Sequence, residues 1–434
     1  MLSAKSIEIY GIQSPHTGSQ ENLNAGSHQR DQIIAAILIA SLLFNAVLSI
    51  LNGHLFHLNQ VYVIVAEASI IASCLLLIFR SLCKRDFPWL ALLFVIVILN
   101  LASSAFAGTL NLKSIRDIAV IPIFVMLGYR YSASPIQMML RIQNIVLFVM
   151  LFEGLFPELF SEIFRVQEYY VYTRGFAEEG FWNKDSTLFV SATRPDERFM
   201  LSFLDIHRLS SVFLEPVSLG NYACIAGIFV IAFWRDLSLR QRIWFTLSTF
   251  CILVGCDGRF ALGSIVLILV LRVFIAKLPQ RSCFVYLPAV LILAALLTFL
   301  FNSDQDQDNV FGRVAKTIHL LSDLELSDFI GATPANEIIN HMDSGASYII
   351  VTQTLFGAVV FWSAISLLPR SLSLLGKFVV HAICLYIACN LLVSYSMFSI
   401  KTASLLWFLY GVAIRNPPEP SSDRDRTART LIAI

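Results

Sequence analysis

Twelve long apolar runs, each separated from the next by a polar stretch, dominate the pattern of the chain. They fall near residues 32–52, 60–80, 88–108, 115–130, 137–156, 214–234, 242–256, 259–276, 284–301, 347–369, 376–395 and 401–415. A helix of about 20 apolar residues is long enough to cross the hydrocarbon core of a bilayer. The runs are continuous rather than alternating, which excludes a transmembrane β-barrel. The pattern therefore predicts an all-α polytopic membrane protein with about twelve transmembrane helices.

The composition agrees with this class. Of the 434 residues, 57% are hydrophobic and only 14% are charged. Soluble domains carry about 25% charged residues, so the composition excludes a soluble enzyme, a nucleic-acid-binding protein and a disordered chain. The net charge of +1 says nothing about partners.

The distribution of Lys and Arg predicts which ends of the helices face the cytoplasm. With the N-terminus inside, the short cytoplasmic loops carry eleven Lys and Arg and the short outer turns only four, as the positive-inside rule requires. Both termini are then cytoplasmic, with a disordered tail at 1–31 and a second tail at 416–434 around a membrane domain at 32–415. Two large extracytoplasmic loops, 158–211 and 302–346, are expected to carry the function, because every other connection is short.

Charged residues also occur inside the predicted spans, where an unpaired charge costs about 3 kcal/mol or more. Glu67 lies in the middle of the second span, and Arg141 and Glu153 bracket the fifth. An interhelical ion pair between Glu67 and Arg141 is the structural interpretation of these charges. A proton relay is the functional one.

A second group of charges gathers at the outer ends of the predicted helices. Arg208 and Glu215 precede the sixth span, Arg259 lies in the turn between the seventh and eighth, and Arg116 opens the fourth. Guanidinium groups bind phosphate oxygens in a bidentate manner and stay charged. Converging arginines therefore indicate a site for an anionic group at the membrane surface. Pairing with nearby carboxylates or with lipid headgroups is the alternative.

Candidates for proton transfer and for sugar binding lie in the two long loops. The second loop ends with His341 and Asp343 at the water–lipid boundary, where a general base would deprotonate an acceptor hydroxyl. A histidine that only caps a turn or contacts headgroups is the alternative. Aromatic rings in the first loop either stack on sugars or anchor the interface. They are Tyr169, Tyr170, Tyr172, Phe181 and Trp182.

Three segments resemble the bacterial polysaccharide polymerase (Wzy) and O-antigen ligase superfamily. They are residues 208–221, which run from an arginine through Glu-Pro into a span, the Gly-Arg-Phe-Ala turn at 258–261, and residues 343–357. Gly258 stands where the family more often has serine. The His-Met-Asp sequence at 341–343 replaces the His-Asn of the ligases, which leaves the base open between histidine and aspartate. Within the superfamily, the chain is similar to the xanthan-type exopolysaccharide repeat-unit polymerases.

The resemblance implies a metal-independent membrane glycosyltransferase without a cofactor. It would polymerise undecaprenyl-pyrophosphate-linked repeat units into exopolysaccharide on the periplasmic face of a bacterial inner membrane. Arg208 and Arg259 would hold the pyrophosphate, and His341 or Asp343 would deprotonate the acceptor. A chain-length regulator and export proteins are implied partners, and nucleic acid is not. Further substrate-binding residues would be Arg116, Glu215, Tyr348 and Trp182.

Two other functions fit the same topology. A ligase would transfer a finished chain to a different acceptor, and sequence separates it poorly from a polymerase. A flippase or transporter should show internal repeats and polar or broken helices near the middle of the membrane. Residues 32–210 and 211–415 show no convincing repeat, and the polar groups collect at the outer edge. A scaffold role explains the edge arginines least well.

Overall fold

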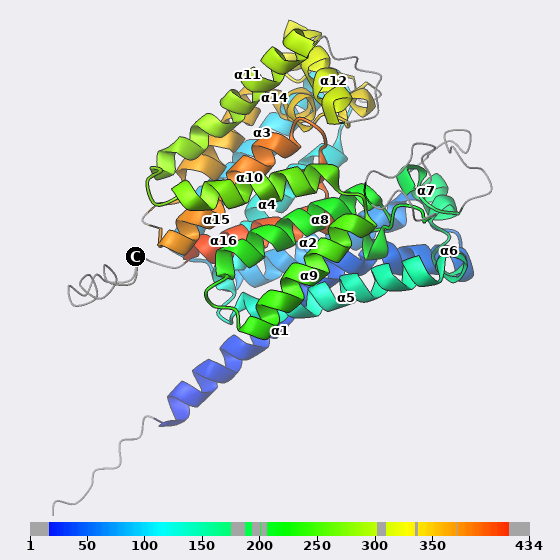
Figure 1. The fold of residues 1–434 in the computed structure, drawn as a ribbon. Coiled ribbons are helices and arrows are strands. Elements are labelled where there is room, and N and C mark those ends of the chain that lie inside the picture. Colours follow the sequence, from blue (N-terminus) through cyan, green and yellow to red (C-terminus); the bar gives the residue numbers. More distant parts are fainter. Residues whose placement is uncertain are drawn as a thin grey trace, which may run out of the picture.

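The computed structural model describes residues 17–174, 187–192, 200, 206–301, 310–334, 337–370 and 372–415, with side chains from residue 27 onward. Within these ranges every regular element is helical and there is no strand (Figure 1). Twelve helices coincide with the twelve apolar runs. They are α1 (Thr17–His54), α2 (Gln60–Phe79), α3 (Phe87–Ala107), α4 (Leu112–Arg130), α5 (Pro135–Leu155), α8 (Pro216–Phe233), α9 (Leu239–Gly255), α10 (Arg259–Phe274), α11 (Cys283–Phe301), α14 (Gly345–Leu367), α15 (Leu374–Asn390) and α16 (Ile400–Arg415).

Shorter helices occupy the two long loops and several turns. The first loop contains α6 (Pro157–Phe164) and α7 (Val166–Arg174), and the second contains α12 (Val310–Ser322) and α13 (Leu326–Phe329). Single turns of 3-10 helix complete the described elements. They are η1 (Lys84–Asp86), η3 (Val190–Ala192), η4 (Ser211–Phe213), η5 (Gln280–Ser282), η6 (Ile338–His341) and η7 (Ser396–Phe398).

In the described part of the chain, seven helices are long and apolar enough to cross a membrane: α1, α2, α3, α5, α8, α11 and α14. Their burial differs widely, because 89% of the apolar window of α8 is buried against only 6% for α11. Exposed apolar side chains such as Phe299 on α11 suit a lipid environment. The chain is therefore an all-helical polytopic membrane protein. The count of twelve spans stays a prediction.

Polar residues with a side-chain oxygen start many of these helices. Asn59, Ser134, Ser238, Ser344 and Ser373 each accept a hydrogen bond from a backbone N–H in the first turn of the following helix. Such caps satisfy backbone donors that have no partner inside the helix. The short turns between the apolar runs therefore also supply the residues that cap the following helices.

The centre of the bundle is α16, which packs against α1, α4, α8 and α15. Its closest neighbour is α4, because glycines face each other at the crossing. A Cβ atom on Gly411 would lie 2.2 Å from the carbonyl oxygen of Val125, and one on Gly128 would lie 2.3 Å from that of Phe408. Small residues at such a crossing let two membrane helices approach closely.

The N-terminal boundary of the folded part differs from the prediction. α1 begins at Thr17, so the expectation of a disordered segment through residue 31 is wrong for its second half. Asp31 is buried, and its carboxylate accepts hydrogen bonds from Ser132 N at 2.9 Å, Ser132 Oγ at 2.6 Å and Ala133 N at 2.8 Å. This contact to the turn between α4 and α5 holds α1 against the bundle at Asp31.

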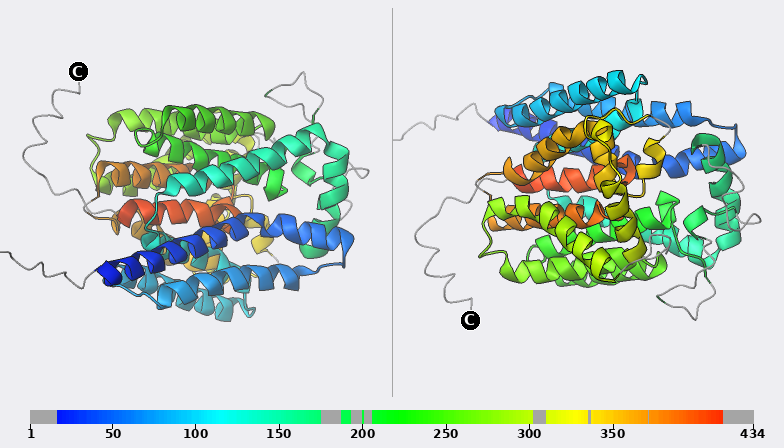
Figure 2. Two further views of the ribbon diagram at one scale, coloured as in Figure 1. Left: turned by 90° about the horizontal axis from the view of Figure 1, so that it is seen from below. Right: turned by 90° about the horizontal axis from the view of Figure 1, so that it is seen from above.

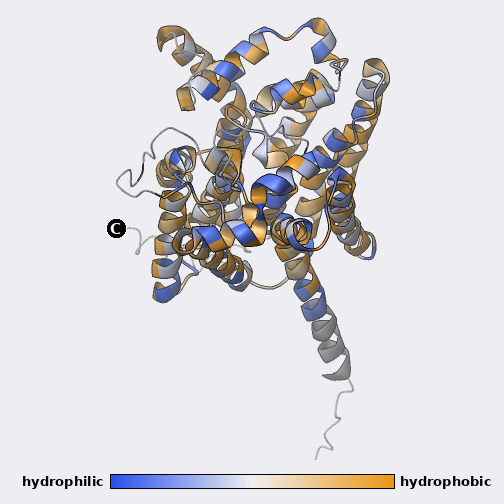
Figure 3. Cartoon of the chain, turned by 90° about the vertical axis from the view of Figure 1, so that its right-hand side faces the viewer, coloured by the Kyte–Doolittle hydropathy of each residue, from blue (hydrophilic) through white to orange (hydrophobic). Residues whose placement is uncertain are grey.

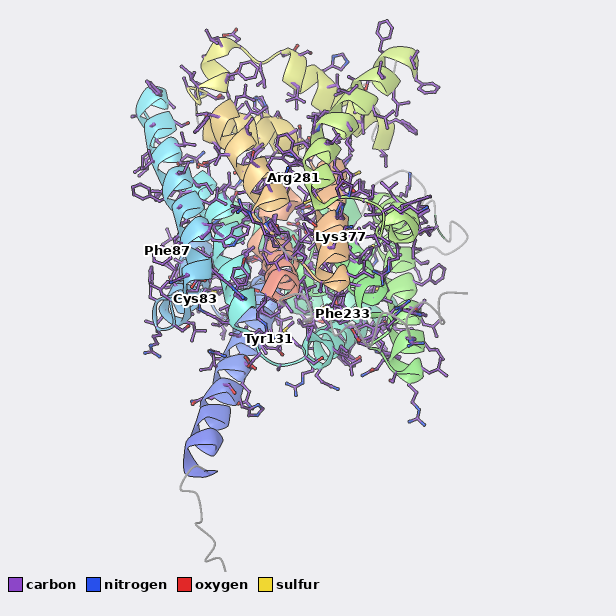
Figure 4. All side chains as sticks on the ribbon, turned by 90° about the vertical axis from the view of Figure 1, so that its left-hand side faces the viewer. Cys83, Phe87, Tyr131, Phe233, Arg281 and Lys377 are labelled. Atoms are coloured by element: carbon purple, nitrogen blue, oxygen red, sulfur yellow. The ribbon has the colours of Figure 1, made fainter. Side chains whose placement is uncertain are left out.

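The two ends of the bundle carry different connections. Figure 4 looks onto one end and labels residues in or beside five predicted cytoplasmic turns, among them Cys83, Tyr131, Arg281 and Lys377. In Figure 2 the start of α1 and the end of α16 lie toward this end, while α6 and α7 lie at the opposite end. The two termini of the membrane domain therefore share one side, and the long loops share the other.

Candidate functional site

A cavity of about 210 Å³ lies at the long-loop end of the bundle. Both long loops contribute to it: Arg174 comes from α7, Arg313 from α12, and Asp343 precedes α14. Glu215 and Lys401 come from the starts of α8 and α16. The cavity is thus lined by three cations and two carboxylates. Figure 3 looks onto this end and shows hydrophilic segments on the short helices that cross it.

Glu215 is the centre of the cavity's charge network. It precedes Pro216, the first residue of α8, and its carboxylate contacts Lys401 Nζ at 2.6 Å and Arg174 Nη1 at 2.9 Å. Ser218 Oγ donates a third hydrogen bond, at 2.8 Å. Burial alone would raise the pKa of Glu215, but the charges of Lys401 and Arg174 outweigh it and hold the pKa at about 2. Glu215 therefore stays ionised and is a poor proton acceptor.

Lys401 and Asp343 occupy contrasting environments in the same cavity. Lys401 is 1% exposed, and its ammonium group also donates to the carbonyl oxygen of Phe213 at 3.3 Å. Asp343 has an exposed side chain that contacts Lys316 Nζ at 2.6 Å. A buried, paired lysine is held rigidly, whereas an exposed carboxylate can exchange its partner for a ligand.

A second charge cluster lies beside the cavity, where α2 meets α4. Arg116 pairs with Glu67 and with Asp117, whose other oxygen accepts a hydrogen bond from Tyr348 Oη at 2.8 Å. The Glu67–Arg141 ion pair expected from the sequence is therefore wrong, because the outer end of α4 brings Arg116 closer. Lys113 connects the two clusters, since its Nζ lies 5.9 Å from the ring centre of Tyr348 and 5.2 Å from that of the cavity residue Tyr395.

Arg208 and Arg259 are not among the residues that line the cavity. Arg208 donates to the carbonyl oxygens of Cys256 at 3.1 Å and of the cavity residue Ser191 at 3.4 Å. Arg259 contacts Asp257 at 3.0 Å. The Arg259–Asp257 contact agrees with the alternative in which the edge arginines pair with nearby carboxylates, whereas Arg208 contacts backbone carbonyl oxygens instead.

Glu153 has a structural role in the same region. It is fully buried and accepts hydrogen bonds from the backbone N–H groups of Ser210 at 2.8 Å and Ser211 at 2.6 Å. His207 Nε2 lies 3.1 Å from its carboxylate. The carboxylate thereby holds the segment that carries Arg208 against α5.

His341 and Asp343 do not face the same space. His341 lines a separate hollow of about 430 Å³, which also receives Asp323, Glu325, Asp328 and Glu337. Burial lowers the pKa of His341, although Asp328 and Glu337 oppose this shift. The histidine is therefore neutral near pH 7 but lies away from the cations of the cavity.

The aromatic residues of the first loop differ in how exposed they are to solvent. Tyr169 and Tyr170 are buried, so their proposed stacking on sugars is wrong; Tyr169 Oη donates to Asn45 at 2.8 Å, and the Tyr170 ring packs under the Arg174 guanidinium. Tyr172 is exposed. Trp182 and Phe181 lie outside the described residues.

Four cations of the site were not singled out in the sequence. Arg174 and Arg313 lie in long loops among other charges, and Lys113 and Lys401 are two of the four Lys and Arg residues in the short outer turns. The position of Lys401 at the start of an apolar run could have identified it as a site residue, because a charge there needs a partner at membrane depth. Nothing in the pattern identified Glu215 as that partner.

Within the described ranges, no three His, Cys, Asp or Glu side chains are grouped to hold a metal ion. No protein-family model, no curated protein and no solved structure matches the chain. The assignment of function therefore rests on the site itself and on the resemblance of three short segments.

Proposed function

We propose that this protein is a membrane glycosyltransferase that polymerises polyprenyl-pyrophosphate-linked oligosaccharide repeat units on the outer face of a bacterial inner membrane. The observation that carries the proposal is the cavity in which Arg174, Arg313 and Lys401, from three distant segments, meet at the long-loop end of the bundle. Fixed cations at this end of the bundle can bind a pyrophosphate group while its lipid tail stays in the bilayer.

In this mechanism the cations bind the donor pyrophosphate, and Glu215 orients Arg174 and Lys401. The acceptor hydroxyl gives its proton to a general base while its oxygen attacks the anomeric carbon of the donor sugar. The bond from that carbon to the pyrophosphate breaks, and the cations stabilise the leaving anion. Asp343 is the preferred base, because it lines the cavity and His341 lines the neighbouring hollow. Arg208, which contacts the cavity residue Ser191, and Arg259 supply further positive charge for the pyrophosphate.

A flippase or transporter is the second candidate, and one observation favours it. Inside α14 the backbone of Thr354 departs from helical geometry, with φ 67° and ψ 162°. Broken helices with polar residues are typical of transporter binding sites. The break lies near the middle of a candidate span, so it carries the transport alternative independently of the cavity.

The deciding experiment is the lipid-linked saccharide profile of cells that lack the protein, measured by extraction and mass spectrometry. A polymerase predicts single repeat units on the carrier that an impermeant oxidant such as periodate can reach from outside, with loss of polymer. Single units that stay protected inside indicate a flippase and contradict the proposal. Full-length polymer retained on the carrier indicates a ligase.

The choice of base is tested by complementing these cells with variants. Asp343→Asn should reduce polymer by about 100-fold or more, the usual loss when a general base is removed, while His341→Gln retains polymer. Asp323→Asn is the matched control, because that carboxylate lies in the neighbouring hollow. Immunoblots of membranes must show equal amounts of each variant. Normal polymer with Asp343→Asn would refute its role.

A further inference from the structure

A small neutral slot lies between α3, α4, α14 and the turn that follows α13. Its volume is about 10 Å³, and no charged side chain is among the residues that line it. A space of this size holds about one water-sized group. Eight of the ten lining residues are polar and neutral: Asn100, Ser103, Ser104, Thr109, Asn111, Ser114, Thr333 and Thr352.

One polar atom in the slot lacks a partner. Asn100 is 1% exposed, and its amide nitrogen donates to Ser114 Oγ and to the carbonyl oxygen of Thr352. Its Oδ1 is buried, and no described residue donates to it. A buried acceptor without a donor costs about 1–3 kcal/mol, and folded proteins normally satisfy such atoms with protein or ordered water.

The break in α14 lies directly beside this slot. Thr352, in the slot, is followed by Gln353, which is 2% exposed and has no partner for either amide atom, and then by Thr354 with its positive φ. A β-branched residue in that conformation is strained, and such strain concentrates at functional sites. Ser103 Oγ donates to the carbonyl oxygen of Gly331, so the second long loop is tied to the slot wall.

We infer that the slot binds a single O–H group, which donates its hydrogen to Asn100 Oδ1. The unsatisfied atom is an acceptor, so an anion does not fit. A cation is disfavoured because Lys113 and Arg116 lie on α4 on either side of the slot residue Ser114. The O–H group belongs to an ordered water or to a sugar hydroxyl of the oligosaccharide. The assignment to a sugar hydroxyl rests on the proposed function.

The test is a cryo-EM structure of the full chain in lipid nanodiscs at a resolution that shows ordered water. One sample has no saccharide, and the other contains lipid-linked oligosaccharide extracted from cells that lack the protein. The inference expects non-protein density within hydrogen-bond distance of Asn100 Oδ1 in at least one sample. Its absence from both overturns the inference.

Substitution gives an independent readout. Asn100→Leu should abolish the non-protein density in the slot, because it removes the acceptor of the bound O–H group; density that persists in this variant overturns the inference. Gln143→Leu is the control for loss of a buried amide, since Gln143 on α5 bonds to Ser248 and lies outside the slot. Its variant should retain the density at Asn100 and leave KM unchanged.

The two sources of the O–H group give different results, and both support binding. A sugar hydroxyl replaces the density of the saccharide-free sample, and Asn100→Leu raises the KM for lipid-linked donor about tenfold, as expected for one lost hydrogen bond. If the O–H group is an ordered water, both samples show the same density, and Asn100→Leu leaves the KM for lipid-linked donor unchanged. If the wild-type protein transfers no sugar, the proposed function fails, while the density in the wild type and in Asn100→Leu still decides the slot.

Discussion

Glu215 shows how one carboxylate organises a site at membrane depth. It holds Lys401 and Arg174, which arrive from the end of the chain and from the first long loop, and it orients them toward the cavity. A buried ion pair contributes little net stability, but removal of one partner leaves a charge that burial disfavours. In the proposed function, the network therefore positions cations for the pyrophosphate more than it stabilises the fold.

Lys401→Met is predicted to lower the free energy of unfolding by about 3 kcal/mol, because Glu215 loses the ammonium group that offsets its burial. The measurement is denaturant unfolding in detergent. The double variant Lys401→Met/Glu215→Gln should recover part of this loss, since the uncompensated carboxylate is gone and the remaining charge, on Arg174, is one-third exposed to solvent. Lys316→Met is the matched control: its ion pair with Asp343 is exposed and should contribute less than about 0.5 kcal/mol. Equal losses for both lysines would contradict the prediction.

His341 is predicted to make stability depend on pH. Burial lowers its pKa in the folded protein below the ordinary value of 6.5. The unfolded chain then takes up the proton first, so stability is full above about pH 6.5 and falls as the pH drops below that value. The unfolding midpoint of the wild type should therefore fall more between pH 7.5 and 5.5 than that of His341→Gln. Parallel curves would show that the histidine is not buried as described.

At the scale of elements, each apolar run became one helix, because backbone groups in hydrocarbon must pair within their own segment. Lateral packing followed a different rule. α4 and α16 approach closely where Gly128 faces Gly411, and the other helices arrange around this pair. α14 departs from the simple pattern, since it breaks at Thr354 beside the neutral slot. Composition alone gave no sign of that break.

Gly411→Leu is predicted to abolish the folded state or to destabilise it by about 3 kcal/mol or more, because any side chain meets the backbone of α4. Fluorescence-detected size-exclusion chromatography after heating measures this loss. Gly263→Leu is the control, since nothing lies within 4 Å of a Cβ at this position in α10. Equal behaviour of the two variants would disprove the close α4–α16 contact.

At the scale of the whole molecule, the two long loops meet at one end of the bundle and the short basic turns lie at the other. This segregation agrees with the charge bias that predicts a cytoplasmic location for the basic end. It also explains why the cavity draws on both loops. A bundle with an odd number of spans between the two loops would place them on opposite sides.

The orientation is tested with an impermeant maleimide. Cys83 lies in an exposed turn at the basic end, so it should react in inverted vesicles and not in spheroplasts. A cysteine introduced as Ser327→Cys in the second long loop should react in spheroplasts. Reversed labelling would invert the topology and move the cavity to the cytoplasmic side, which excludes a periplasmic polymerase.

The sequence by itself determined the class of the protein and the positions of its helices, because long apolar runs in lipid can satisfy their backbones only as helices. It also predicted Glu215 and Asp343 as site residues, and both line the cavity. Only the tertiary structure decided that Arg174, Arg313 and Lys401 complete their cavity, that Arg116 rather than Arg141 pairs with Glu67, and that His341 faces another hollow. Those pairings depend on which helices are neighbours, and side-chain packing sets that arrangement without a periodic signal along the chain.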